Sequence, residues 1–411
     1  MRVGLLHYTG PPVVGGVEQT LAHHARHLAA SGHTPVLIVG QGKPPAPGVA
    51  VRRVARVHSR HPEVLAVKRQ LDSGTVGRRY HDLVARLRRE LLRATRGLDC
   101  LIVHNALGLH KNLALTAALR DLHRDGVAPR LIAWHHDLSW DRPDYAAELH
   151  PGEPWDLLRQ PWPGVVQVTV SAHQQSRLAR LLGIPAESIT VIPPGVDRAD
   201  FGRWGAVTRR LYHSLGLDEA DLILLLPTRI TRRKNIEQAI AITAALARAC
   251  GLDARLLVTG PPGPHNPSNQ AYRMELVALC RKLGVDSAVH FLHGRTPGAT
   301  ADLDDATVAE LFDVADALLF PSRAEGFGIP LLEAGLARLP VFAADLDVFR
   351  ESGGADVTYL GPDEAPEESA RRILSVLEAS PAHRLRRRVL RDFTWSGLVR
   401  RRLLPLLGSH D

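Results

Sequence analysis

The chain has 411 residues, of which 45% are hydrophobic and 23% are charged, and its formal net charge is +8. This composition is typical of a folded globular protein and excludes disordered and fibrous classes, and the length favours two domains of comparable size. No stretch reaches the roughly 20 apolar residues of a membrane span and no secretion signal is recognisable, so we expect a cytoplasmic protein.

Short apolar stretches alternate with longer amphipathic segments along the chain, which is the pattern of parallel sheets covered by helices. In the first half we expect strands at 3–7, 35–39, 49–54, 100–104, 131–134 and 165–170. The segment 189–197 carries two prolines and a glycine, which interrupt any regular element, so a domain crossover is expected near Pro194. The alternation then resumes, with strands expected at 222–226, 256–259, 289–292, 317–320, 341–343 and 357–360.

The sequence therefore predicts an α/β fold of two tandem, doubly wound, Rossmann-like domains that face a cleft, at 1–194 and 195–375. Residues 368–407 have a helical pattern, and we expect the segment 376–411 to pack back toward the N-terminal domain. Ligands of open α/β sheets bind beyond the carboxyl ends of the strands. Functional residues are therefore expected at strand ends.

Basic residues are densest at 78–96 and 384–402, both with helical periodicity. A solvated helix face explains such a run best, with docking onto an anionic membrane surface or an acidic acceptor as the alternative. No nucleic-acid-binding motif accompanies the charge, so nucleic acid is not expected as a partner. Cys100, Cys250 and Cys280 are widely spaced in apolar segments, which predicts reduced core residues.

The first candidate sites follow strands of the N-terminal domain. Gly15 and Gly16 come after the strand at 3–7 and open a helix, where free N–H groups can bind a phosphate. A Gly-Gly pair alone, however, is more often only a tight turn. His104 and Asn105 end another strand, and we expect them to line the same cleft on the acceptor side.

The next strand ends in a cluster of histidines. One of His135 and His136 can donate or accept a hydrogen bond or act as a base, and Asp137 can orient it or bind a hydroxyl. Adjacent histidines rarely bind one metal ion and no further ligands stand at a recognised spacing, so we expect no metal. Trp140 begins an aromatic segment that ends at Trp162; its rings either stack on a sugar acceptor or anchor a long loop, and burial is favoured.

Two cations follow the strand at 222–226. Arg229 stands at the strand end and Lys234 near the start of the next helix. Cations at a helix N-terminus are disfavoured by the helix dipole, which argues for a bound anion. Fixed cations in a partly dry cleft would stabilise the negative charge that develops on a departing nucleotide diphosphate.

A loop with two carboxylates, Glu325 and Glu333, is the most informative feature of the sequence. Pro330 suits the first turn of a helix, which places Glu325 in the loop and Glu333 in the first helical turns. Gly326 and Gly328 permit a close approach by a ligand. A polyhydroxylated ligand that carries phosphate fits these features.

These motifs together resemble the retaining glycosyltransferases of family 4, also called the glycosyl transferases group 1, which have the GT-B fold. The resemblance rests on Arg229 with Lys234 and Asn235, on the segments 191–197 and 321–333, and on the two glycines before the first helix. It runs from the first strand to about residue 360, with the motifs in the family's order. The loop between the two glutamates is specific, whereas the glycine pair is not.

The resemblance implies a role for each donor-side residue. Glu333 would bind the ribose of the donor nucleotide, as acids do in other nucleotide-binding folds. Glu325 would contact the donor sugar, together with the loop formed by Gly326, Phe327 and Gly328.

The same resemblance assigns Arg229 and Lys234 to the diphosphate and the Gly15-Gly16 turn to its distal phosphate. His136 would touch the donor sugar near the reacting carbon, and the register leaves His135 open for this role. From their place in the first domain, we also expect Asp137 and Trp140 on the acceptor side.

The implied reaction moves a hexose of the glucose or mannose type from a nucleotide-diphosphate sugar to an acceptor hydroxyl, with retention and an oxocarbenium-like transition state. The acceptor is either a small glycoside or polyol, or a lipid-linked sugar. The alternatives are a nucleotide-sugar epimerase or hydrolase on the same fold, or a lipid-acceptor glycosyltransferase at the membrane surface.

The family's front-face mechanism needs no metal or cofactor, and none is expected here. The run Asp302-Leu303-Asp304-Asp305 is similar to the Asp-x-Asp motif of metal-dependent sugar transferases. It precedes Thr307 and an apolar helix, so we expect helix capping instead.

Overall fold

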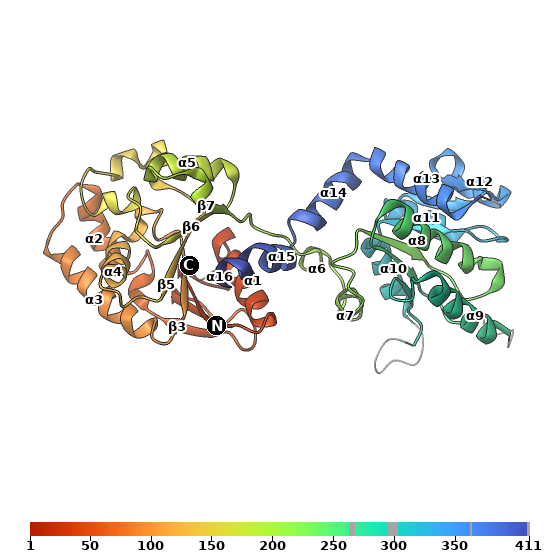
Figure 1. Cartoon of the computed structure of the whole chain (residues 1–411), viewed down its shortest axis with the longest axis horizontal. Coiled ribbons are helices and arrows are strands. Elements are labelled where there is room, and N and C mark those ends of the chain that lie inside the picture. The colour runs from red at the N-terminus through yellow and green to blue at the C-terminus, as the bar shows by residue number, and fades with distance from the viewer. Residues whose placement is uncertain (263–267, 295–302, 362–363, 409–411) are drawn as a thin grey trace. The chain divides into compact units, whose positions relative to one another are not determined.

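The structure is a computed structural model that describes residues 1–262, 268–294, 303–361 and 364–408 (Figure 1). The chain forms two compact units. The first comprises Met1–Gly195 together with Phe393–Asp411, and the second is Val196–Asp392. Each unit is a parallel sheet covered by helices, so the predicted α/β class and the tandem Rossmann-like arrangement are confirmed.

The first unit contains a seven-stranded sheet with the order β3-β2-β1-β4-β5-β6-β7. Its strands are β1 (Arg2–Thr9), β2 (Thr34–Gln41), β3 (Ala50–Arg53), β4 (Cys100–His104), β5 (Arg130–His135), β6 (Val166–Thr169) and β7 (Ile189–Val191). Its helices before the crossover are α1 (Gly16–Ala30), α2 (Pro62–Asp72), α3 (Arg78–Ala94), α4 (Leu113–Arg124) and α5 (Ala172–Leu182). The order of the strands reverses between β1 and β4, which is where ligands bind in such sheets.

The second unit contains a six-stranded sheet with the order β10-β9-β8-β11-β12-β13. Its strands are β8 (Leu222–Leu226), β9 (Ala254–Val258), β10 (Val289–Phe291), β11 (Ala317–Phe320), β12 (Val341–Ala344) and β13 (Thr358–Leu360). Its helices are α6 (Arg198–Phe201), α7 (Ala206–Ser214), α8 (Ile236–Cys250), α9 (Ser268–Leu283), α10 (Asp305–Val314), α11 (Ile329–Leu336), α12 (Asp347–Gly353), α13 (Pro366–Ala379) and α14 (Pro381–Asp392). Here the order reverses between β8 and β11.

The crossover predicted near Pro194 is confirmed, but the first three residues of the segment 189–197 form strand β7, which was not predicted. Ile189, Thr190 and Val191 favour extended structure, and they pair in parallel with β6. Only the residues after them interrupt regular structure. The prolines end the strand before the chain passes to the second unit at Val196.

The predicted helical segment at 368–407 is helical, but it is broken into several pieces. Pro381 has no N–H to continue α13, and the residue before it is Ser380, which is extended. The remaining pieces are α14, then α15 (Trp395–Leu398), a π-helical stretch at Val399–Leu403 and α16 (Leu404–Gly408).

The return to the first unit begins at Phe393 and not at residue 376. Residues before it stay with the second unit because α13 packs on α8 and Arg386 lies 2.7 Å from the Asp316 carboxylate. After it, α15 lies beside α1 (Figure 1), and Leu403 and Leu407 are buried in the same apolar cluster as α1. The C-terminal residues therefore complete one face of the first unit.

Replacing Leu403 with alanine is expected to lower the free energy of unfolding of the first unit by about 2–5 kcal/mol. The side chain is fully buried, so its loss leaves a cavity beneath α1. Urea denaturation followed by fluorescence measures the change. Leu385→Ala on α14 is the control, because that side chain is 62% exposed and its loss should change stability by less than about 0.5 kcal/mol. Equal stability of Leu403→Ala and wild type would contradict the packing of the C-terminal segment.

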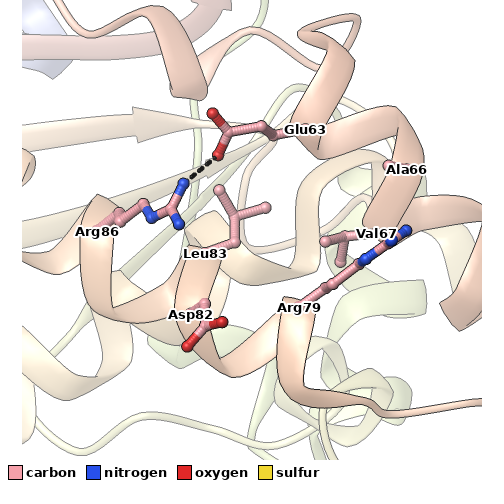
Figure 2. A pocket seen from close by; sticks show the side chains of 7 residues that line it. All are labelled: Glu63, Ala66, Val67, Arg79, Asp82, Leu83 and Arg86. Carbon is pink, nitrogen blue, oxygen red and sulfur yellow. Dashed lines mark hydrogen bonds and ion pairs between the residues drawn. The ribbon is translucent and has the colours of Figure 1, made fainter.

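Helix α3 carries the first predicted basic run. Its apolar face is buried against the core, and its arginines point outward, as expected for a solvated helix face. Figure 2 shows the shallow hollow of about 290 Å³ between α2 and α3, where Arg86 pairs with Glu63 at 3.0 Å. Arg88 pairs with Asp125 at 2.8 Å. Over the described residues, every helix is too short or too polar to cross a membrane.

Candidate active site

The loop between β11 and α11 holds the two predicted carboxylates. Gly328 has a φ of +97°, and a Cβ atom there would lie 2.8 Å from the Phe349 ring, so only glycine fits this turn. Helix α11 begins at Ile329 with Pro330 in its first turn, as predicted. Glu325 therefore lies in the loop, and Glu333 projects from the second turn as an exposed side chain.

Lys234 and Glu325 meet although they are far apart in the sequence. The Lys234 ammonium donates a hydrogen bond to Glu325 Oε1, and Arg233 Nη1 donates to Oε2 at 2.9 Å. The Lys234 ammonium also lies 5.0 Å from the centre of the Phe320 ring. The side chains of Lys234 and Glu325 are only 11% and 9% exposed, so this ion pair is nearly shielded from water.

Burial and the ion pair have opposite effects on these two groups. Burial lowers the pKa of Lys234, and the hydrogen bond to Glu325 opposes that change without cancelling it. Burial would raise the pKa of Glu325, but the hydrogen bond from Lys234 and the charges around it outweigh burial and lower that pKa. Glu325 is therefore an ionised carboxylate at neutral pH.

The local backbone fixes these cations. Residues Arg232–Lys234 form a single 3-10 turn after β8, and Asn235 adopts a left-handed conformation with a φ of +50° before α8. Arg229 precedes the turn as an exposed side chain. No group in the described part of the chain forms an ion pair or hydrogen bond with its guanidinium. Arg229 is thus a cation available to a ligand beside the Lys234 turn.

The rest of the predicted loop is open to a ligand. A Cβ atom at Gly326 would meet nothing within 4 Å, and Phe327 is 45% exposed. The loop thus presents free backbone and an exposed ring between Glu325 and α11.

The predicted histidines lie in the first unit, at the carboxyl ends of β4 and β5. His136 is partly exposed, and its Nε2 lies 3.1 Å from His104 Nδ1. His135 is buried, and its Nε2 is hydrogen-bonded to Gln167 Oε1 at 2.9 Å. Of the two histidines left open by the sequence, His136 is therefore the one that a ligand can reach.

His104 and Asn105 are buried, and Asn105 positions the loop after β5. Asn105 has a φ of +60°, and its Oδ1 accepts hydrogen bonds from the N–H groups of His136 at 2.8 Å and Asp137 at 3.1 Å. The acceptor-side role of these two residues stays a prediction.

Three residues around His136 were missed by the sequence analysis. His7 Nδ1 is 3.0 Å from the His104 carbonyl oxygen, the His24 ring lies 5.5 Å from that of His104, and Gln167 holds His135. His7 ends a predicted strand, which is a signal that could have been used. His24 lies three residues after buried Leu21 in α1, so helical spacing also marks it as buried.

Acid is expected to destabilise the first unit, because its buried histidines must lose protons to fold. Burial lowers the pKa of His24 to about 3 and that of His135 to about 4. Both are near 6.5 in an unfolded chain, so the unfolded state binds more protons below pH 6.5. The stability these groups contribute is complete above pH 6.5 and is lost as the pH falls toward 4.

The expected slope is about 1.4 kcal/mol per pH unit for each of these two histidines. Urea denaturation at pH 7, 6 and 5 measures it. His135→Gln should reduce the slope by one histidine's share, whereas His81→Gln, at an exposed position on α3, should not. A free energy of unfolding that stays constant from pH 7 to 5 would contradict the assignment of neutral buried rings.

The predicted glycine pair opens α1. Gly15 is the residue before the helix, with extended backbone, and a Cβ atom there would collide with the Glu18 carboxylate. A Cβ atom at Gly16 would meet nothing within 4 Å. Gly15 is therefore explained by a contact within the protein, and Gly16 is the position that a ligand can approach.

The aromatic segment anchors its own loop, as favoured from the sequence. Trp155 and Trp162 are buried, and the ring N–H of Trp140 donates to the Trp155 carbonyl oxygen at 3.2 Å. Arg159 stacks on the Trp140 ring at 4.3 Å. Asp137 is partly exposed and lies 3.7 Å from Arg142.

The acidic run before α10 caps that helix. Asp304 Oδ1 accepts a hydrogen bond from the N–H of Thr307 at 2.8 Å, and Asp305 is the first helical residue, so the capping prediction is confirmed. Asp302 lies outside the described residues.

Comparison with known protein families gives two matches that divide at the unit boundary. The model of Glycosyltransferase Family 4 matches residues 14–200, and that of Glycosyl transferases group 1 matches residues 209–390. The chain belongs to the group 1 glycosyltransferases. Each unit of this glycosyltransferase has the Rossmann-like sheet that the predicted GT-B fold requires. All of the candidate residues fall within the two matched ranges.

Individual relatives of this glycosyltransferase act on different molecules. The D-inositol 3-phosphate glycosyltransferase of Actinosynnema mirum is 36% identical over 42% of the chain and 39% of that protein's length. The mannosylglucosylglycerate synthase of Petrotoga mobilis is 24% identical over 71% of the chain and 74% of that protein. The glycogen synthase of Mycobacterium tuberculosis is 26% identical over 96% of the chain and 92% of that protein.

Proposed function

We propose that this glycosyltransferase moves a hexose of the glucose or mannose type from a nucleotide-diphosphate sugar to an acceptor hydroxyl, with retention and without a metal. The observation that carries the proposal is the shielded Lys234–Glu325 pair beside the unpaired Arg229. Two cations at the end of β8 suit a diphosphate, and a fixed carboxylate suits sugar hydroxyls.

When the donor binds, Lys234 contacts its diphosphate and Glu325 contacts its sugar. The diphosphate attracts the Lys234 ammonium and Arg229, which stabilise the charge that grows on the leaving phosphate. Glu325 keeps its hydrogen bond from Arg233, so its carboxylate stays in place to accept hydrogen bonds from the sugar. Glu333, exposed on α11, takes the ribose hydroxyls.

The chemical step is a displacement on one face of the sugar. The bond from the anomeric carbon to the phosphate oxygen breaks, the acceptor oxygen attacks from the same side, and its proton passes to the leaving phosphate. His136 is partly exposed, and burial is the largest cause that lowers its pKa to about 3. It therefore acts as a neutral hydrogen-bonding group beside the anomeric centre and adds no positive charge there.

The test is release of nucleoside diphosphate from a panel of nucleotide sugars, with and without pools of glycosides, polyols and lipid-linked sugars. We expect release with at least one donor, an unchanged rate in EDTA, and an α-linked product from an α-linked donor by NMR coupling constants. No release from any donor under any condition would overturn the proposal. Free sugar or a changed epimer without acceptor would assign the site to hydrolysis or epimerisation instead.

A further inference from the structure

A second group of cations lies in the first unit, on the loops that follow β4 and β5. Lys111 stands at the end of the first loop and Arg142 on the second. The loops are joined by hydrogen bonds from Ser139 N–H to the Gly108 carbonyl oxygen at 2.9 Å and from His110 N–H to Ser139 Oγ at 3.0 Å. Because β4 and β5 are parallel neighbours, both loops leave the edge of the sheet that also carries His136.

Both cations contact the same aromatic ring. The Lys111 ammonium lies 4.0 Å from the centre of the Tyr145 ring, and the guanidinium carbon of Arg142 lies 5.0 Å from it. The Lys111 side chain is only partly exposed, and burial is the largest cause that lowers its pKa. No carboxylate of the described residues lies within 4.0 Å of its ammonium. A partly buried ammonium that makes no direct contact with a carboxylate can gain one from an anionic ligand.

The neighbouring acids attract Lys111 only from a distance, because each makes its direct contacts with other groups. Glu148 Oε2 accepts from Lys68 and from His110 Nε2, each at 2.6 Å. Lys68 also binds both oxygens of Asp72, at 2.7 and 2.8 Å. Among the described residues, these contacts leave Lys111 without a carboxylate in direct contact with its ammonium.

The surroundings of Lys111 are preorganised by the same network. His110 is buried, its Nδ1 lies 2.7 Å from Ser139 Oγ, and its ring packs edge-on against Tyr145 at 4.8 Å. The residue before Lys111 and the ring beneath its ammonium are therefore both fixed. A ligand that binds there loses little free energy to ordering the site.

We propose that Lys111, with Arg142 at the rim and Tyr145 beside it, binds an anionic group of the acceptor, either a phosphate monoester or a carboxylate. This inference rests on the proposed function and names the acceptor class. Arg142 shares its charge with Asp144 at 3.0 Å, so Lys111 contributes most of the attraction. The bond is a charge-assisted hydrogen bond from the ammonium to the anion.

The experiment measures equilibrium binding of three probes by isothermal titration calorimetry: glucose 6-phosphate, glucuronate and the neutral methyl glucoside. We expect at least one anionic probe to bind at least about tenfold more tightly than methyl glucoside. Lys111→Met, which keeps the length of the side chain over Tyr145, should abolish that difference, and Lys111→Arg should restore most of it. Lys282→Met, at an exposed lysine on α9, is the matched control and should bind as wild type does.

Two results would overturn the inference: anionic probes that bind no more tightly than methyl glucoside, or a preference that survives in Lys111→Met. A preference that survives in Lys111→Met would mean that Lys111 contacts Tyr145 but does not bind the anion. If Lys111→Met does not fold by circular dichroism, Arg142→Gln replaces it, with an expected loss of about threefold in affinity for the anionic probe and none for the neutral one. No loss there would equally overturn the inference.

The failure of this inference can be told from failure of the proposed function. Release of nucleoside diphosphate is measured in parallel on the same proteins. Anion binding that depends on Lys111 without any donor turnover would remove the proposed function and keep the subsite. Donor turnover with no preference for anionic acceptors would do the reverse.

Discussion

Replacing Lys234 with methionine is expected to lower kcat/KM for the nucleotide sugar by about 1,000-fold. Removing one preorganised group that stabilises transition-state charge lowers rates by about 100- to 1,000-fold, and a shielded cation belongs at the upper end of that range. The Lys234 side chain is 11% exposed, so water cannot replace its ammonium. Methionine keeps an unbranched side chain beside Phe320 but loses the ammonium above its ring, and Glu325 keeps its hydrogen bond from Arg233. Steady-state kinetics with a saturating acceptor measures the change.

Arg232→Gln provides the matched control two residues away. Arg232 belongs to the same 3-10 turn, but its guanidinium binds Glu275 on α9 at 2.8 Å, and that ion pair is exposed. Its loss should change kcat/KM by less than about threefold, because exposed ion pairs contribute little. Similar losses in the two variants would mean that general positive charge, and not the position of Lys234, supports the reaction.

The positions of individual functional residues followed from the sequence because parallel sheets place strand ends at one edge. Arg229, Lys234 and Glu325 were expected after strands, and they lie after β8 and β11. These two strands are neighbours, which the sequence could not give, because strand order depends on how the helices pack. The contact between Lys234 and Glu325 follows from that neighbour relation and from the Asn235 turn.

The surroundings of the expected acceptor-side residues were harder to predict than those of the donor-side residues, for a physical reason. The expected acceptor-side residues lie in the first unit, where His104 and Asn105 are buried at the end of a strand, whereas Asp137 in the loop after β5 is partly exposed. The alternation of strands and helices along the sequence predicts that a residue lies at a strand end. It does not predict whether the side chain there points into the protein or toward solvent when the backbone bends. The left-handed backbone at Asn105, which non-glycine residues adopt rarely, causes the difference.

The long C-terminal pattern shows where periodicity misleads. Residues of α13, α14 and α16 all repeat at helical spacing, yet they belong to two different units. Pro381 was the available signal for a break within this pattern. The point of return at Phe393 depends instead on tertiary packing, since Arg386 is held by Asp316 and Trp395 packs against Gly195.

Replacing Glu325 with glutamine is expected to lower kcat about 100-fold or more while leaving the affinity for nucleoside diphosphate within about threefold. Glutamine can still accept a hydrogen bond from Arg233, but it lacks the charge that strengthens hydrogen bonds from sugar hydroxyls. Hydrogen bonds and charges around Glu325 outweigh burial and hold its pKa below the ordinary value, so the wild-type group is ionised at neutral pH. Calorimetry with nucleoside diphosphate measures the affinity, and steady-state kinetics with the nucleotide sugar measures kcat.

Glu333→Gln is the partner experiment, because the two carboxylates belong to the same loop and helix but are assigned to different parts of the donor. Glu333 is exposed on α11 and has no part in the Lys234 ion pair, so its loss should weaken diphosphate binding about tenfold and leave the catalytic step largely intact. A rise in KM with little change in kcat is the kinetic sign of such a ground-state contact. If Glu325→Gln weakened diphosphate binding as much as Glu333→Gln did, Glu325 would act on the nucleotide, and the division of the loop between ribose and sugar would be wrong.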